Sequence, residues 1–329
     1  MRPSTILFAL SVTSLAQTIT SPVSEDFETR DINTTAADGS NSRFPAPGQF
    51  GQGQGQGQGQ GRPQGQPQGG NCPAVWQTIG RDLVPMMLDT NMCNDFARGA
   101  IRAAFHDCGT WDKAQGDTGG CDGSLFLAQE YTNEENRGLA DIVPRIGALA
   151  QKYTVGVADM FQFAGAAATR ICPGGPIVQT FVGRKDSSNP APTGKLPNVR
   201  APGDELVALF ADKGISAAEL AALVGAHTAS KQFFVDPSKP GASQDTTPGA
   251  WDVAFYDQTL QNKAPFTFPS DQQIAMNAQS GPAFKSFVDN QFGWGFAYSA
   301  AATKLSLLGV PGGSSGLMDC TSALPRGSY

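Results

Sequence analysis

The sequence DFARGAIRAAFHD at residues 95–107 is the most informative segment of this chain. Its apolar residues recur at helical spacing, so it predicts a helix with one buried face. Arg102 and His106 are four residues apart, which places both side chains on one face of that helix, with Phe105 beside them. A lone histidine is usually structural or superficial, but a guanidinium one turn away favours a functional role for His106.

The second of the two histidines, His227, lies in the sequence GAHT at residues 225–228. The preceding residues 217–226 predict a helix that begins after Ser216, with Glu219 completing a capping box. Two histidines exclude every site that needs three imidazoles. Their wide separation also excludes the HExxH motif of metalloproteases.

Oxygen-rich segments follow both histidines. Asp107 is followed by GGCDGS at residues 119–124, in which alternate residues can turn carbonyl and side-chain oxygens inward. Thr228 is followed by DTTPGAWD at residues 245–252, where carboxylates, hydroxyls and carbonyls recur. All-oxygen sites of this kind suit Ca²⁺, although neither segment matches an EF-hand and each alone also fits an ordinary polar turn.

Composition and patterning favour a mainly α-helical protein. The 329 residues are 40% hydrophobic and 16% charged, with a net charge of −6 and no basic run, which argues against binding to nucleic acid. No apolar stretch reaches about 18 residues, so no membrane span is expected. Residues 155–164 predict a further buried helix, and the proline-rich residues 189–202 predict a loop.

The chain divides into three expected parts. Residues 1–16 have the positively charged N-terminus, the short apolar segment and the small residues at the cleavage site that are typical of a secretory signal peptide. Residues 17–70 are rich in Gly, Gln and Pro, have little to bury, and are expected to be a disordered tail, with an N-glycosylation sequon at Asn33. Residues 71–329 have a globular composition. All six cysteines lie in this last part, and an even number in a secreted chain favours three disulfides without choosing the pairing.

The sequences RAAFHD at residues 102–107 and GAHT at residues 225–228, each with its oxygen-rich segment, resemble the secreted fungal haem peroxidases of class II. This group contains the lignin, manganese and versatile peroxidases, and the resemblance extends from Cys72 to about Pro325. It implies a mainly α, two-lobed fold with few short strands and haem b between the lobes. It also implies a monomer that reduces H₂O₂ to water and oxidises small phenolic or aromatic donors by one-electron steps through an oxoferryl intermediate.

The resemblance further implies a role for each site residue. His106 would move a proton between the two oxygens of H₂O₂, and Arg102 would stabilise the negative charge that develops as the O–O bond breaks. His227 would bind the haem iron. The remaining members are Phe105 over the haem plane, Asn136 and Glu130 orienting the distal imidazole, and Asp271 accepting a hydrogen bond from the proximal imidazole.

Two Ca²⁺ ions and three disulfides also follow from the resemblance. The distal calcium ligands would be Asp107, Gly120, Asp122 and Ser124. The proximal calcium ligands would be Thr228, Asp245, Thr247, Ala250 through its carbonyl, and Asp252. The implied disulfides are Cys72–Cys320 and Cys93–Cys172, which leaves Cys108–Cys121 as the third.

The chain departs from the family pattern at the positions that select donors. Asp95, Gly99 and Phe233 stand where the manganese site of the family has three carboxylates, so efficient Mn²⁺ oxidation is not expected. Ala222 stands where lignin-oxidising members have an exposed tryptophan. Trp111 and Trp294 are alternative surface electron relays, although a packing role is favoured for both.

Three other hypotheses remain. The first is a non-catalytic secreted binding or adhesion protein stabilised by calcium on the same fold. The second is a serine hydrolase, because residues 312–316 fit GxSxG, but both histidines precede the serine and the expected order is the reverse. The third is an intracellular peroxidase of the ascorbate type, which the signal peptide and the cysteines oppose.

Overall fold

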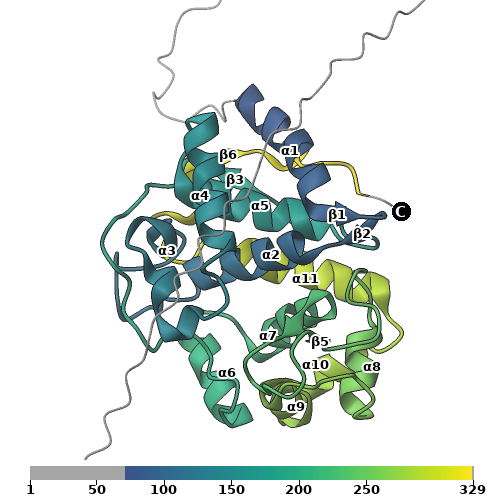
Figure 1. The fold of residues 1–329 in the computed structure, drawn as a ribbon. Coiled ribbons are helices and arrows are strands. Elements are labelled where there is room, and N and C mark those ends of the chain that lie inside the picture. The colour runs from purple at the N-terminus through teal and green to yellow at the C-terminus, as the bar shows by residue number, and fades with distance from the viewer. Residues whose placement is uncertain (1–70, 328–329) are drawn as a thin grey trace, which may run out of the picture. The chain divides into compact units, whose positions relative to one another are not determined.

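The computed structural model describes residues 71–327, which form a mainly α-helical structure (Figure 1). The predicted signal peptide at residues 1–16 and the predicted tail at residues 17–70, with its sequon at Asn33, lie outside the described residues. The helices are α1 (Ala74–Met87), α2 (Asp95–Cys108), α3 (Ser124–Leu127), α4 (Ile142–Tyr153), α5 (Val157–Ile171), α6 (Gly203–Asp212), α7 (Ala217–Val224), α8 (Ala254–Leu260), α9 (Pro269–Met276), α10 (Gly281–Ser286) and α11 (Gln291–Leu305).

Short antiparallel strand pairs connect these helices. Within residues 71–327, β1 (Leu88–Asp89) pairs with β2 (Met92–Cys93), β3 (Phe181–Val182) with β6 (Met318–Asp319), and β4 (Lys231–Gln232) with β5 (Ala242–Ser243). In Figure 1, α1 to α5 form one group of helices, α6 to α10 form a second, and α11 lies along the boundary. The mainly α fold with few short strands is therefore confirmed.

Helix α2 begins where the sequence predicts and packs closely on α5. The side chain of Asn94 caps α2 by accepting from the backbone N–H groups of Phe96 and Ala97. Gly165 of α5 lies against Ala104 of α2, so close that a Cβ on the glycine would lie 2.6 Å from the Ala104 Cβ. These small residues bring the two helix backbones together and fix the position of the catalytic candidates on α2.

Helix α7 ends earlier than predicted. The capping box is present, because Ser216 Oγ accepts from the Glu219 N–H at 3.2 Å and Glu219 Oε2 accepts from the Ser216 N–H at 2.7 Å. The α-helix stops at Val224, and Gly225–Ala229 continues as a 3₁₀ helix, η3. A Cβ at Gly225 would lie 2.6 Å from Trp294 Nε1. The turn that carries His227 therefore approaches α11 at a position where only glycine fits without rearrangement.

All six cysteines are paired, in the three disulfides that the family resemblance implies. Cys72–Cys320 joins the start of α1 to the segment after β6, and Cys93–Cys172 joins β2 to the end of α5. Cys108–Cys121 joins the end of α2 to the oxygen-rich segment that follows it.

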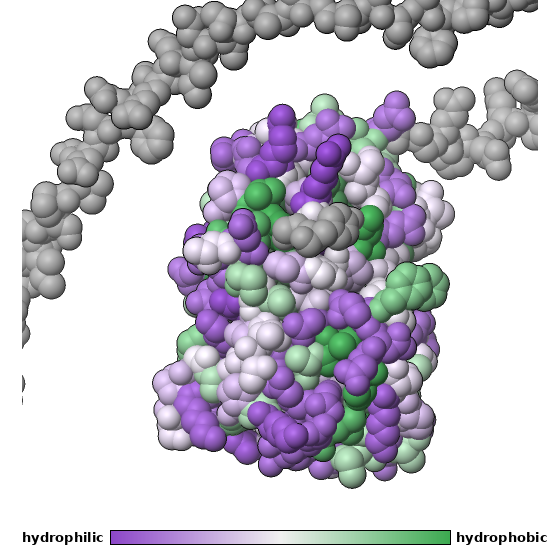
Figure 2. All heavy atoms as spheres, turned by 90° about the vertical axis from the view of Figure 1, so that its right-hand side faces the viewer, coloured by the Kyte–Doolittle hydropathy of each residue, from purple (hydrophilic) through white to green (hydrophobic). Residues whose placement is uncertain are grey.

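Figure 2 shows one face, on which hydrophobic residues form small separate spots among hydrophilic ones. Among residues 71–327, none of the helices combines the length and apolar character needed to cross a bilayer. Phe292 and Phe296 on α11 are the most exposed aromatic residues described here, at 88% and 76%.

Two helical glycines give a matched test of the α2–α5 contact. We expect Gly165→Ala to lower the free energy of unfolding by about 1–3 kcal/mol, because the new methyl group overpacks the contact with Ala104. Gly295→Ala in α11 is the control, since its Cβ would meet only Pro176 at 3.8 Å. The control should be neutral or slightly stabilising, because alanine favours a helix interior. Thermal unfolding of both variants measures the difference, and equal melting temperatures would contradict the importance of this contact.

Candidate active site

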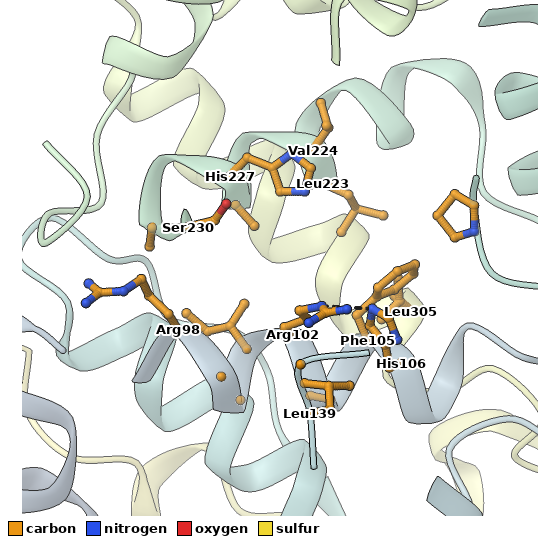
Figure 3. A pocket seen from close by; sticks show the side chains of 18 of the residues that line it. Arg98, Arg102, Phe105, His106, Leu139, Leu223, Val224, His227, Ser230 and Leu305 are labelled. Carbon is orange, nitrogen blue, oxygen red and sulfur yellow. Dashed lines mark hydrogen bonds between the residues drawn. The ribbon is translucent and has the colours of Figure 1, made fainter. Parts of the chain in front are cut away.

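A cavity of about 790 Å³ lies between α2 and the turn that carries His227. Figure 3 shows His227 entering it from one side and Arg102, Phe105 and His106 of α2 facing it from the opposite side. Apolar side chains such as Leu139, Leu223, Val224 and Leu305 cover much of the remaining wall. The structure thus brings to one cavity two histidines that are 121 residues apart in the sequence.

Hydrogen bonds fix the protonation of the His106 ring. Its Nδ1 lies 2.7 Å from Asn136 Oδ1, and the Asn136 amide nitrogen donates to the Glu130 carbonyl oxygen at 2.8 Å. The amide is therefore oriented with its oxygen toward the ring, so Nδ1 carries the proton of the neutral imidazole. Nε2 is then an acceptor, and Arg102 Nε donates to it at 3.2 Å.

The surroundings keep His106 neutral and Arg102 charged. Burial lowers the pKa of His106 to about 3, and the nearby Arg102 charge adds to this effect, while the Asn136 hydrogen bond opposes it. Burial also lowers the pKa of Arg102 to about 10, which still leaves the guanidinium charged at neutral pH. An unprotonated imidazole beside a fixed cation is the arrangement that general base catalysis with charge stabilisation requires.

Glu130 contributes in a different way from the one its carboxyl group suggests. It is the main-chain carbonyl of Glu130 that holds Asn136, while Oε1 of its side chain accepts from the Ala191 N–H at 2.7 Å.

Phe105 lies with its ring edge-to-face with His106, at 5.6 Å between centroids, and stacked on Phe210 at 6.2 Å. Both contacts restrict the residues on the cavity side of α2.

The opposite imidazole is held by a buried carboxylate. His227 Nδ1 lies 3.0 Å from both carboxylate oxygens of Asp271, which is fully buried at the start of α9. Phe255 and Phe268 make edge-to-face contacts with the ring at 6.0 and 5.3 Å between centroids. Nδ1–H donates to the carboxylate, so Nε2 keeps its lone pair for a metal ion, and the carboxylate raises its basicity.

This site fits a haem. The cavity is large, and its wall is largely apolar, as a porphyrin requires. His227 offers one nitrogen with the second-nitrogen partner typical of metal-binding imidazoles. His106 Nε2 is engaged by Arg102, so the structure distinguishes one iron ligand candidate from one acid–base candidate.

The candidate ligands of the distal calcium form a buried group that includes a polar atom without a hydrogen-bond partner. Asp107 accepts from the backbone of Gly123 at 3.1 Å, and Asp122 accepts from the backbone of Ser124 at 3.0 Å. Burial, followed by the charge of Asp122, raises the pKa of Asp107 well above its usual value. Ser124 Oγ is buried with no hydrogen-bond partner. A hard cation would satisfy the hydroxyl and neutralise the carboxylates.

The proximal calcium candidates gather around Asp245. Its two oxygens accept from Thr228 Oγ1 at 2.6 Å and from the Thr247 N–H at 2.8 Å. Burial first, and then the charge of Asp252, raise the pKa of Asp245 to about 6. Ala250 closes the turn by donating its N–H to the Thr247 carbonyl at 2.9 Å. Within residues 71–327, no three His, Cys, Asp or Glu side chains are placed so that they could hold one metal ion, so hydroxyl and carbonyl oxygens would have to complete either site.

Sequence reasoning missed two residues of the cavity wall. Arg184 lines the cavity and forms a buried ion pair with Asp159 at 3.0 Å. Tyr298 of α11 also lines the cavity and is 5% exposed. Neither lies in a recognisable motif, and the ion-pair partner of Arg184 is 25 positions away, so no local signal identifies them.

The structure tests two hypotheses from the sequence, the tryptophan relays and the serine hydrolase. Trp294 is fully buried, so it is not a surface relay, whereas Trp111 is partly exposed and donates its indole N–H to the Gly116 carbonyl at 2.7 Å. The GxSxG match at residues 312–316 forms a 3₁₀ turn before β6. It lacks the strand-to-helix turn of a nucleophilic serine, so the hydrolase hypothesis is wrong.

Comparison with known proteins agrees with this geometry. Residues 81–290 match the peroxidase family. A low-redox potential peroxidase of Taiwanofungus camphoratus is 33% identical over 260 residues, which cover 73% of this chain and 76% of that protein. Manganese peroxidase 3 of Phlebia radiata is 32% identical over 271 residues, 74% of each chain. A peroxidase of Arthromyces ramosus is 28% identical over 279 residues, which cover 76% of this chain and 75% of that protein.

Removal of calcium should weaken the fold. We expect a calcium chelator to lower the melting temperature of the full chain by about 5–10 °C, because the buried carboxylates then repel one another without a cation. Added CaCl₂ should restore it. Ser124→Ala should reduce the calcium retained after dialysis, while Ser315→Ala in an exposed turn is the control. Equal calcium content in both variants and an unchanged melting temperature after chelation would contradict the two sites.

Proposed function

The chain belongs to the peroxidase family, and on that premise we propose that it is a secreted haem peroxidase of H₂O₂ that oxidises small phenolic and aromatic donors. Residues 71–329 would form the peroxidase domain. The observation that carries the proposal is the pair of imidazoles at one cavity. His227 is tied to the buried Asp271, and His106 is held neutral between Asn136 and Arg102.

Haem bound through His227 would supply the iron chemistry that cleaves the peroxide. His106 would remove a proton from H₂O₂ at Nε2, since Asn136 holds the other ring proton on Nδ1. Arg102 Nε already donates to that same Nε2, so peroxide must displace this hydrogen bond when it binds. The displaced guanidinium then lies next to the oxygen atoms and stabilises negative charge on the leaving one. His106 returns its proton to that oxygen, which completes a water molecule.

Asp271 would strengthen the proximal side of the site. Its carboxylate accepts from His227 Nδ1 with both oxygens at 3.0 Å and gives the imidazole partial anionic character. A more basic imidazole stabilises a more highly oxidised iron, which favours reaction with peroxide over tight binding of O₂.

The three positions that correspond to the manganese site of the family do not favour binding of Mn²⁺ in this chain. Asp95 is bound by Arg98 at 2.6 Å and lies 3.7 Å from Lys231 Nζ, so its charge is already compensated. A Cβ at Gly99 would lie 2.9 Å from Ile142 Cγ1, which blocks a longer side chain there. Phe233 is 48% exposed at the same rim and supplies no oxygen. Small aromatic donors are therefore favoured over Mn²⁺.

Secretion fits the observed cysteine chemistry. Three disulfides persist best in an oxidising compartment, and the N-terminal sequence predicts export into one.

The non-catalytic adhesion hypothesis does not account for a neutral buried histidine opposite a carboxylate-bound one, so catalysis is the preferred function.

Replacement of the proposed base tests the mechanism. We expect His106→Leu to retain haem, measured by its Soret absorbance, and to react with H₂O₂ about 10²–10⁴-fold more slowly in stopped-flow experiments. His227→Ala is the contrasting variant and should lose haem. Undiminished peroxide reactivity in His106→Leu would refute the role of this residue. A wild-type protein without a Soret band would instead favour the binding protein.

The pH profile of the same rate constant is a second check on His106. Its pKa of about 3 in the folded protein lies below the ordinary value of 6.5, so the rate should stay level from pH 7 to about 4 and fall toward pH 3. Between pH 6.5 and 3, the unfolded chain binds a proton that the folded site does not. The contribution of this residue to stability is therefore present above pH 6.5 and lost as pH falls toward 3. An inflection of the rate near pH 6 would contradict this assignment.

A donor panel tests the substrate class. With H₂O₂ in excess, we expect saturable oxidation of a phenol, and oxidation of Mn²⁺ and of a high-potential non-phenolic aromatic no faster than in a haem-only control. Phe233→Asp should not confer Mn²⁺ oxidation by itself, because Asp95 stays paired with Arg98 and Gly99 stays blocked by Ile142. Saturable Mn²⁺ oxidation by the wild-type protein would overturn the proposed donor class.

A further inference from the structure

Two fully buried tryptophans are stacked beside the cavity. Trp251, from the loop after β5, and Trp294, from α11, lie with ring centroids 5.4 Å apart and planes 8° from parallel. Tyr298, one turn along α11, contacts both indoles at 4.8 and 6.0 Å between centroids. The three rings form one contiguous group of readily oxidised side chains.

This group touches both the cavity and the turn that carries His227. Tyr298 lines the cavity directly. Trp294 Nε1 donates to the Ala222 carbonyl at 3.0 Å. It also lies under Gly225, where a Cβ would be 2.6 Å from Nε1. The indole pair is therefore in van der Waals contact with the backbone two residues before the proposed iron ligand.

Packing alone gives no reason for an indole at position 251. Trp251 Nε1 is buried with no hydrogen-bond partner, which costs free energy that a phenylalanine would not cost. The same aromatic group uses Phe255, Phe284 and Phe287 at neighbouring buried positions. The sequence therefore keeps a group with an unmet hydrogen bond where an apolar ring would fill the space.

We propose that the Trp251–Trp294 pair is an internal one-electron donor to the cofactor in the cavity, reached across the ring of Tyr298. Each H₂O₂ takes two electrons from the loaded protein and forms two waters with two protons. When no external donor is bound, one electron moves from the indole pair to the oxidised cofactor and leaves one positive charge on the pair. A phenol that enters the cavity later restores the pair without touching it, because its electron returns across the ring of Tyr298 and its proton is released to solvent.

The surroundings favour Trp294 as the resting place of this charge. Parallel stacking lets the two rings share it, and the Trp294 N–H keeps its proton on the hydrogen bond to the Ala222 carbonyl, whose dipole offsets a buried positive charge. Tyr298 is suited to passing the electron, not to holding the charge. Burial raises its pKa to about 12, so its hydroxyl keeps its proton in this environment.

The burial of both rings also limits what the pair can oxidise. Neither indole is exposed, so a bulky aromatic molecule cannot reach them from solvent. The pair would serve as an electron reserve that returns the cofactor toward its resting state when donors are scarce. This internal donor requires the haem-dependent function proposed above.

Spectroscopy of the haem-loaded full chain tests the proposal. One equivalent of H₂O₂ is mixed without donor and frozen within seconds, and radicals are recorded by electron paramagnetic resonance. We expect an indole radical in the wild type that is lost in Trp294→Phe and retained in Trp76→Phe. Trp76 is the matched control, because it is also buried and contacts an aromatic ring, that of Phe163 at 4.8 Å.

Peptide mass spectrometry after excess H₂O₂ gives an independent measurement. Oxygen addition at Trp251 and Trp294 should exceed that at Trp76 at least tenfold, and Trp294→Phe should suppress it at Trp251. Tyr298→Phe removes a single oxygen atom, so it tests the route without disturbing the fold, and we expect the indole radical to form several-fold more slowly in this variant.

The two proposals fail in different ways. If the wild-type protein shows no Soret band or no reaction with H₂O₂, the proposed function fails. If peroxide reacts normally but the radical signal is absent, or persists in a folded Trp294→Phe variant with normal haem content, the internal donor is overturned.

Discussion

The site depends on one constraint, that each imidazole must present Nε2 to a shared cavity while its Nδ1 is held from behind. Asn136 holds His106 in this way, and Asp271 holds His227. Because one holder is a neutral amide and the other a carboxylate, two identical side chains acquire different properties. His106 is suited to exchanging a proton, and His227 is suited to binding a metal ion.

The rest of the fold maintains that constraint. Helix α2 packs on α5 where Ala104 meets Gly165, and η3 packs on α11 at Gly225. Oxygen-rich segments stand directly next to both imidazoles, since Asp107 follows His106 and Thr228 follows His227. Cations bound there would stiffen both sides of the cavity at the residues that matter most, which links the proposed calcium sites to the chemistry of the iron.

The features of this chain that bear on donor choice lie at the cavity rim and behind the proximal turn. The relatives named as manganese and low-redox potential peroxidases are similar in identity to this chain, so overall similarity does not choose between donors. We propose that the rim does so, through the Asp95–Arg98 pair and the Gly99–Ile142 contact. The stacked Trp251–Trp294 pair provides oxidisable rings at a buried position, and their neighbour Tyr298 lines the cavity.

Much of the site was open to prediction from the sequence, because its signals are local. The start of α2, the capping box at Ser216 and the one-turn spacing of Arg102 and His106 each depend on residues a few positions apart. The family resemblance supplied Asn136, Asp271 and the disulfide pairs, which spacing did not choose. Only the tertiary structure decided that Glu130 acts through its carbonyl, that α7 ends at Val224, and that Trp251 stacks on Trp294. Those outcomes depend on packing between segments far apart in the chain, and a periodic pattern within one segment carries no information about which distant side chain will fill the space beside it.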